Sequence, residues 1–167
     1  MLILKDLPDP KILTKFAERY ADANIEHVIH FLTLLRVGSD LSSALDGFLA
    51  SYGLLQGRWW VLILLMREES LMSSPSILAE KAGVTRATMT GLIDGLDKEG
   101  LVIRVTDLDD RRKFQIKLTS SGQDKLDEIM PEYYRRVGEL MGKLSSEEGS
   151  DLASILAKLQ TNTDAFK

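Results

Sequence analysis

Apolar residues recur at helical spacing through the first third of the chain. Asp9 and Pro10 supply a helix N-cap and a proline at the first helical position, and the apolar positions that follow predict a first helix to Tyr20. Residues 25–53 continue the helical spacing, either as one bent helix or as several shorter ones. Residues 57–66 are almost wholly apolar, which predicts a core helix that is buried on most of its surface.

Two short helices separated by a glycine are predicted next. Ser74 and Pro75 repeat the pattern of cap and proline, and Gly83 is typical of a helix end. Thr85 is placed to cap a second helix that runs as far as Gly100. The apolar positions of this second helix follow the i, i+3, i+4, i+7 spacing of a single buried face: Met89, Leu92, Ile93 and Leu96.

The period of the pattern then changes from helical to two. Ile103 and Val105 in one segment, and three apolar residues between 114 and 118 in the next, alternate with basic or polar residues. Alternation of this kind predicts a hairpin of two strands, each with one buried face. The connection, residues 106–112, is polar and has no glycine, so we expect an extended loop at the hairpin tip.

The C-terminal third is again helical and carries an apolar stripe that requires a partner surface. Thr119 is placed to cap a long helix with a bend at Pro131, and Ser145 and Glu148 have the spacing of a capping box for a final helix. Because both ends of the chain are amphipathic, we expect them to join two copies in a homodimer. The stripe comprises Leu126, Ile129, Tyr133, Val137, Leu140 and Leu144, and then Leu152, Ile155, Leu156 and Leu159.

Composition limits the possible classes of function. The chain has 167 residues, 44% of them apolar, and lacks an uninterrupted apolar run of about 18 residues, so we expect a compact cytoplasmic protein with no membrane partner. The absence of cysteine removes disulfides and thiolate metal sites. We expect neither an enzyme nor a cofactor, because the sequence has no glycine-rich phosphate loop and no nucleophile beside a positioned base. The net charge of −4 requires any contact with nucleic acid to come from a locally basic surface.

The order helix, glycine turn, helix and hairpin is that of the winged helix-turn-helix, whose second helix enters the major groove of DNA. We therefore predict a mainly α fold with a small two-stranded β-wing. The predicted domains are N-terminal dimerisation helices over 1–52, the winged helix-turn-helix DNA-binding domain over 53–119 and C-terminal dimerisation helices over 120–167.

The predicted second helix has a narrow outer side that suits the groove. The residues that project opposite the apolar stripe are Ala87, Thr90, Gly91 and Asp94. Small residues let a helix backbone approach base edges closely. Thr85 and Thr88 supply hydroxyls for phosphates or bases, although threonines at a helix start often serve only as caps. Arg86, in the first turn, is the expected direct reader of bases.

The hairpin tip supplies the second predicted contact. Arg111 and Arg112 lie at the turn, where planar cations can enter the narrow minor groove of A·T-rich DNA, although a solvated charged tip is the alternative. We expect an aspartate of this loop, such as Asp110, to pair with an arginine and fix its direction. The candidate DNA-binding residues are Ser74, Thr85, Arg86, Ala87, Thr88, Thr90, Arg104, Asp110, Arg111, Arg112 and Lys113.

Five motifs, in their order and spacing, resemble the MarR (multiple antibiotic resistance regulator) family. They are SPSILAE at 74–80, GVTRAT at 83–88, KEGLV at 98–102, DDRR at 109–112 and IKLT at 116–119, and the resemblance covers residues 53–122. It implies a homodimeric transcriptional regulator, most simply a repressor, that binds a pseudo-palindromic operator in double-stranded DNA and is released by a small aromatic or phenolic ligand. Gly91 and Gly95 depart from the larger, often basic residues of relatives. The DNA contacts that the resemblance implies are Thr85, Arg86, Thr88, Thr90 and Arg112, with Arg111 beside it.

Three residues are candidates for a small-molecule site. The resemblance implies a ligand crevice between the winged domain and the dimerisation helices, where Trp59 or Trp60 would line it near His30. The alternative is that both tryptophans belong to the core. Glu26, His27 and His30 share a helix face, but a tetrahedral metal site would need further ligands, so we expect hydrogen-bonded histidines and no metal.

The alternative to a DNA-binding regulator is a winged-helix module that binds protein and not DNA. The acidic net charge suits this alternative. The paired arginines of the wing and the small outer side of the second helix favour DNA.

Overall fold

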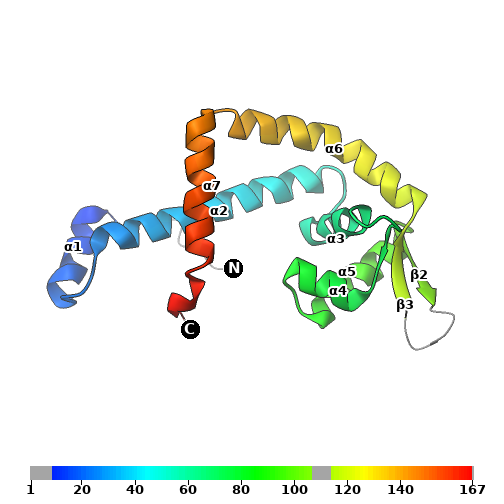
Figure 1. The fold of residues 1–167 in the computed structure, drawn as a ribbon, viewed down its shortest axis with the longest axis horizontal. Coiled ribbons are helices and arrows are strands. Elements are labelled where there is room, and N and C mark those ends of the chain that lie inside the picture. The colour runs from blue at the N-terminus through cyan, green and yellow to red at the C-terminus, as the bar shows by residue number, and fades with distance from the viewer. Residues whose placement is uncertain (1–8, 107–113, 167) are drawn as a thin grey trace. The chain divides into compact units, whose positions relative to one another are not determined.

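The computed structural model describes residues 9–106 and 114–166, and it is mainly helical with one small sheet (Figure 1). The predicted fold class is confirmed. In chain order the elements are α1 (Pro10–Arg19), α2 (Ile25–Ala50), α3 (Gln56–Met66), β1 (Met72–Ser73), α4 (Pro75–Ala82), α5 (Arg86–Lys98), β2 (Val102–Thr106), β3 (Phe114–Leu118), α6 (Ser120–Met141), α7 (Ser146–Gln160) and the 3-10 turn η1 (Thr163–Phe166).

Backbone contacts divide the chain into two compact units, Met1–Val61 and Leu62–Lys167. In the first unit α1 packs against α2, which is a single helix of 26 residues. The side chain of Asn24 begins α2 by accepting a hydrogen bond from the backbone N–H of His27 at 3.0 Å. The sequence left open whether this segment is one helix or several, and the structure shows one continuous helix.

Helix α2 is strongly apolar and open to solvent in the single chain. Among the described residues it is the one helix long and apolar enough to cross a membrane, and 0% of its most apolar window is buried. It is not an uninterrupted apolar run, because Glu26, Arg36 and Asp40 lie within it. One such helix is weak evidence for a membrane span, because a helix that another protein surface covers has the same composition.

The turn between α4 and α5 forms as the sequence predicts. The hydroxyl of Ser74 accepts the N–H of Ile77 at 3.3 Å and begins α4, and the hydroxyl of Thr85 accepts the N–H of Thr88 at 3.1 Å and begins α5. Gly83 ends α4 in the left-handed region at φ 65°, where a side chain would be strained. With both caps in place, α4 packs against α5.

The predicted hairpin forms, but its sheet has three strands and not two. β2 pairs antiparallel with β3, and β1 pairs antiparallel with the other edge of β3. The two-stranded wing is therefore confirmed, and the third strand, β1, was not predicted. A strand of two residues carries no alternating pattern that the sequence could have revealed.

The alternation predicted for the hairpin holds for two of the three apolar residues of β3 and fails for β2. In β3, Ile116 and Leu118 are buried as expected, whereas Phe114 is 38% exposed. In β2 the buried residue is Val102, whereas Ile103 and Val105 are exposed. Val102 is directly opposite Leu118, and directly opposed residues of an antiparallel pair share one face. The even-numbered residues of β2 therefore face the core side, contrary to the prediction.

The wing is tied to the start of α6. The hydroxyl of Thr119 lies 2.8 Å from the carbonyl oxygen of Gly100 and 3.0 Å from that of Leu101, and it accepts the N–H of Gly122 at 3.0 Å. A Cβ at Gly122 would collide with the carbonyl oxygen of Leu101, so only glycine permits this approach. The buried apolar residues of the second unit are Leu62, Leu64, Leu65, Leu78, Ala79, Met89, Ile93, Leu96, Val102, Ile116, Leu118, Leu126 and Ile129.

The two C-terminal helices form with the predicted caps. Helix α6 continues through Pro131 and ends before Leu144, which therefore lies in the turn and not on the helical stripe. The capping box of α7 has both of its bonds, from the N–H of Glu148 to the Ser145 hydroxyl at 3.2 Å and from the N–H of Ser145 to the Glu148 carboxylate at 2.8 Å. The bond from the Ser145 backbone lowers the pKa of Glu148.

Candidate DNA-binding site

The exposed side of α5 is the narrow surface that the sequence predicts. Met89, Ile93 and Leu96 are buried, which turns the opposite side of the helix to solvent. Ala87 and Thr90 lie on that side and are exposed. With side chains this small, the backbone of α5 can come close to the edges of base pairs in a major groove.

The threonines of α5 are hydrogen-bonded within the helix. The hydroxyls of Thr85 and Thr88 lie 2.9 Å apart, and the hydroxyl of Thr90 donates to the carbonyl of Arg86 at 2.9 Å. A hydroxyl that donates within a helix can still accept a bond, and its neighbouring methyl group can contact the methyl of thymine. This geometry leaves Thr90 available to DNA as an acceptor or an apolar contact rather than as a donor.

Arg86 is an exposed cation at the start of α5. The N–H groups of the first helical turn point outward at the same end, so an anion that approaches it meets both a guanidinium group and the positive end of the helix dipole. Ser74 is half-buried, and its hydroxyl is occupied by the cap of α4. Of these two candidates, Arg86 has the geometry of a phosphate or base contact.

Arg104, one of the candidate DNA-binding residues, forms ion pairs with two residues of α5. Its Nη2 donates to a carboxylate oxygen of Asp94, and its Nε lies 3.5 Å from a carboxylate oxygen of Asp97. Its guanidinium carbon lies 5.4 Å from the centre of the Phe114 ring. Sequence reasoning placed Asp94 on the outer side of the helix but missed this pairing. Two acids three residues apart on one helix were the signal that could have suggested a basic partner.

The wing loop joins β2 to β3 and falls outside the described residues. The described strands fix where it begins and ends, because Thr106 and Phe114 are directly opposed across the hairpin. The roles expected of the loop residues are therefore still predictions. The four candidate DNA-binding residues that the loop contains are Asp110, Arg111, Arg112 and Lys113.

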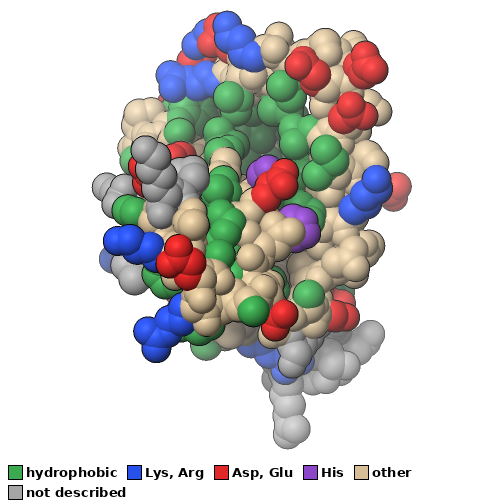
Figure 2. All heavy atoms as spheres, turned by 90° about the vertical axis from the view of Figure 1, so that its left-hand side faces the viewer, with side chains coloured by type: hydrophobic (Ala, Val, Ile, Leu, Met, Phe, Trp, Pro, Cys, Tyr) green, Lys and Arg blue, Asp and Glu red, His purple; other side chains and the backbone are tan. Residues whose placement is uncertain are grey.

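The candidate ligand residues differ in exposure. Trp59 is buried, Trp60 is 41% exposed, and the centres of their rings lie 4.5 Å apart. His30 is exposed on α2. Figure 2 shows the two histidines, in purple, at the surface of the chain. In the described parts of the chain, no three His, Asp or Glu side chains are grouped to hold a metal ion.

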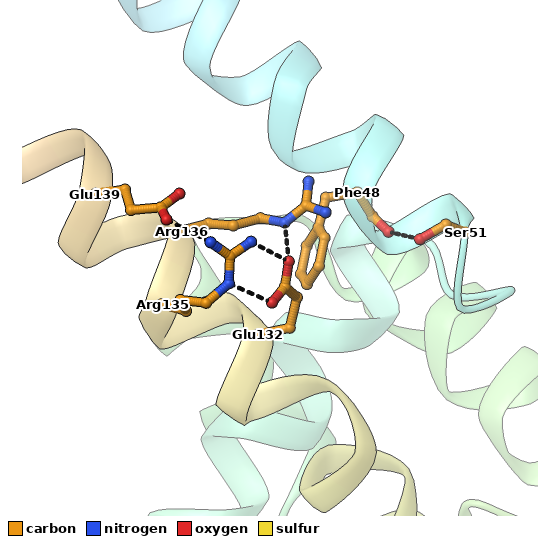
Figure 3. Close-up of polar contacts among 6 residues, drawn as sticks. All are labelled: Phe48, Ser51, Glu132, Arg135, Arg136 and Glu139. Carbon is orange, nitrogen blue, oxygen red and sulfur yellow. Dashed lines mark hydrogen bonds and ion pairs between the residues drawn. The ribbon is translucent and has the colours of Figure 1, made fainter.

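A network of charges that the sequence did not suggest lies on α6 (Figure 3). Both carboxylate oxygens of Glu132 accept bonds from Arg135 at 2.7 Å, and one of them also accepts a bond from Arg136 at 2.7 Å. These bonds, that from Arg135 first, lower the pKa of Glu132 from 4.5 to about 2. The network spans the turn after Pro131, whose missing N–H weakens the helix locally.

Sequence comparison places the chain among known regulators. The MarR family pattern matches residues 56–114. The HTH-type transcriptional repressor YetL of Bacillus subtilis (strain 168) is 33% identical over 164 residues, which cover 98% of this chain and 98% of YetL.

Two solved structures share the fold. Sco3205 of Streptomyces coelicolor, a MarR family transcriptional regulator in complex with DNA, has a TM-score of 0.77 and 21% identity over 83% of this chain and 88% of that one. The organohalide-sensing regulator RdhR-CbdbA1625, in its 2,4-dichlorophenol-bound form, has a TM-score of 0.74 and 22% identity over 98% of this chain and 90% of that one. With the identity to YetL and the match over α3 to β3, the chain belongs to the MarR family of transcriptional regulators.

Proposed function

We propose that this protein is a cytoplasmic, homodimeric repressor that binds a pseudo-palindromic operator through α5 and the wing. The observation that carries the proposal is the exposed side of α5, where small side chains flank an arginine at the positive end of the helix. YetL, a relative of this chain, is named a transcriptional repressor, and Sco3205, which shares its fold, is known in complex with DNA. The three-part division into residues 1–52, 53–119 and 120–167 belongs to this proposal.

The direct test is selection of genomic DNA fragments by the purified full-length chain, followed by gel-shift titration of the selected sequence. Arg86→Ala is expected to weaken binding by about 1–3 kcal/mol and to relax the preference for one base, because Arg86 would contact a base edge. Arg112→Ala is expected to weaken binding by a similar amount, and it should leave unchanged the base preference at the position that Arg86 would contact. Arg19→Ala is the matched control, since it removes one exposed arginine from α1 and leaves α5 unchanged.

Failure to enrich any sequence, with no shift at low salt, would overturn the proposal. That outcome would favour the winged-helix module that binds protein, which the net charge of −4 suits. The named functions of relatives also argue against an enzyme.

The dimer is supported by apolar surface that the single chain leaves uncovered. Ile155 and Leu159 of α7 are 53% and 48% exposed, and Leu41 of α2 is 45% exposed. Exposed apolar stripes of this kind mark an interface. A two-fold dimer would present two copies of α5 to successive major grooves, about 10 base pairs apart. A monomer by light scattering at micromolar concentration would remove this part of the proposal.

We also propose that a small phenolic ligand releases the operator, with Trp60, Trp59 and His30 as candidate contacts. The support is that RdhR-CbdbA1625 is known in a 2,4-dichlorophenol-bound form and that Trp60 presents an exposed aromatic face beside its neighbour. Titration of the protein with 2,4-dichlorophenol, followed by tryptophan fluorescence, tests this. Trp60→Phe is expected to abolish the change, and Trp59→Phe to retain it. An unchanged signal in the wild-type protein and in both variants would exclude the site.

A further inference from the structure

Arg104, in strand β2 of the wing, forms ion pairs with two aspartates of α5. It lies at the centre of β2, and the two carboxylates that it binds lie one turn apart near the end of α5. All three side chains belong to the second compact unit, in which α5 packs against β2. The ion pairs therefore connect the two elements that would contact DNA.

The register of the sheet explains why Arg104 reaches α5. Arg104 is directly opposite Ile116, and that residue is fully buried. Because directly opposed residues share a face, the side chain of Arg104 leaves β2 on the core side, at the edge where α5 lies. Ile103, one position earlier, is exposed on the other face.

The groups around Arg104 are ones that a guanidinium group binds, namely two carboxylates and an aromatic ring. Its planar fork has five N–H donors and can bind two carboxylates at once, and its flat face can lie over an aromatic ring. Asp94 and Asp97 supply the acceptors, and Phe114 supplies the ring, 5.4 Å away. Phe114 is the first residue after the wing loop, so the same side chain contacts both strands at the base of that loop.

The acids on α5 would oppose DNA binding if they were not neutralised. The side chain of Asp94 is 59% exposed and that of Asp97 is 39% exposed. Asp94 lies on the side of the helix that carries Ala87 and Thr90, where a phosphate backbone would come close. A cation that pairs with these acids lowers the repulsion without itself contacting DNA.

We propose that Arg104 is a positioning residue: it holds β2 and the base of the wing against α5 and neutralises Asp94 and Asp97, and it is not a ligand of the DNA backbone. This inference rests on the proposed DNA-binding function, which it refines. It replaces the prediction that Arg104 is itself a DNA-binding residue.

The salt dependence of binding separates the two roles. A side chain that contacts phosphate releases a counterion, so its removal lowers the slope of log K against log salt by about 0.9. Arg104→Ala is expected to weaken operator binding roughly tenfold, as for a lost contact to a charged group, with the slope unchanged. Arg19→Ala is again the control for the loss of one positive charge.

Rescue of binding is the second arm of the test. In the Arg104→Ala background, Asp94→Asn together with Asp97→Asn removes the carboxylates that Arg104 would otherwise neutralise, so the part of the lost affinity that comes from their repulsion of DNA is expected to return. The same two substitutions in the wild-type background break the link between β2 and α5 but leave no unpaired carboxylate, so they are expected to weaken binding less than Arg104→Ala does. A slope that falls by about one, or a triple variant no better than Arg104→Ala, would overturn the proposal.

A measurement without DNA keeps the test independent of the proposed function. In the nuclear magnetic resonance spectrum of the free protein, the Nε–H signal of Arg104 is expected to be shifted and slow to exchange, and to move on Asp94→Asn/Asp97→Asn. An arginine signal that these substitutions leave unchanged, in a protein whose amide spectrum shows a normal fold, would refute the pairing. If the wild-type protein binds no DNA but this signal behaves as expected, the proposed function fails and the link between α5 and β2 stands.

Discussion

The helix-turn-helix and the last helix carry apolar stripes of the same helical period, but they differ in what covers those stripes. In α5 the apolar residues Met89 and Ile93 are at most 1% exposed. In α7 the corresponding residues Ile155 and Leu156 are 53% and 42% exposed. The period of a sequence thus predicts which side of a helix is apolar, and only the tertiary structure shows whether the chain itself covers that side.

The apolar stripe of α5 is thus buried within the single chain, and the apolar stripe of α7 is not. The second unit closes its core around α4, α5 and the sheet, whereas every residue of α7 except half-buried Gly149 is exposed. In a protein proposed to bind a two-fold operator, a surface of this kind points to a second copy of the chain. Substitutions in each region test whether a second copy of the chain covers α7.

The largest effect is expected from a charge on the uncovered stripe of α7. Leu156→Glu should dissociate the dimer, because an uncompensated buried charge costs roughly 3–5 kcal/mol and a two-fold interface contains it twice. Sedimentation or light scattering at micromolar concentration measures the change. Ser150→Glu, on the opposite side of α7, is the matched control and should leave the dimer intact. A Leu156→Glu protein that stays dimeric would show that this stripe is not the interface.

A smaller effect, on the free energy of unfolding, is expected from a substitution in the buried core of the second unit. Ile116→Ala should lower the free energy of unfolding by about 2–5 kcal/mol, because the residue is fully buried and leaves a cavity. Ile155→Ala makes the same chemical change on the uncovered stripe. Urea unfolding at two protein concentrations separates the two, since only a loss at the dimer interface should depend on concentration. If Ile155→Ala costs as much as Ile116→Ala at every concentration, α7 is covered by its own chain.

Gly91 gives a test in which stability and DNA binding move in opposite directions. Among the described residues, no heavy atom lies within 4 Å of the place where its Cβ would be, so alanine fits the helix. Gly91→Ala should raise the free energy of unfolding by about 0.5–1 kcal/mol, because glycine weakens a helix interior. It should also weaken operator binding, since the added methyl group holds α5 away from the bases. Gains in both stability and affinity would contradict a close approach of α5 to DNA at this position.

The smallest effect is expected from the charge network on α6. The pKa of Glu132 falls from 4.5 to about 2 through its bonds to Arg135 and Arg136, so the folded state favours the ionised carboxylate. The network therefore adds stability above about pH 4.5, and this contribution is lost as the pH falls toward 2. Thermal unfolding between these limits should show a steeper loss for the wild-type protein than for Glu132→Gln. Parallel curves would mean that the network adds nothing to stability.

Much of this protein follows from its sequence alone, because helix ends and turns are decided by neighbouring residues. Ser74, Gly83 and Thr85 set the boundaries of the helix-turn-helix through short-range hydrogen bonds and one left-handed backbone angle. The capping box of Ser145 and Glu148 is equally local. The family motifs lie in these same segments, so the sequence also indicated the class of regulator.

Other features depend on residues that are distant in sequence, and only the tertiary structure decided them. Strand β1 exists because the backbone of Leu71 accepts the N–H of Leu118 at 2.9 Å and the two following residues pair with β3. Arg104 turns toward Asp94 because Val102 fills the core, although the pattern of β2 predicted the opposite face. In β2 the more apolar face, that of Ile103 and Val105, is the exposed one, so the choice between the two faces is made by the packing partner and not by the strand.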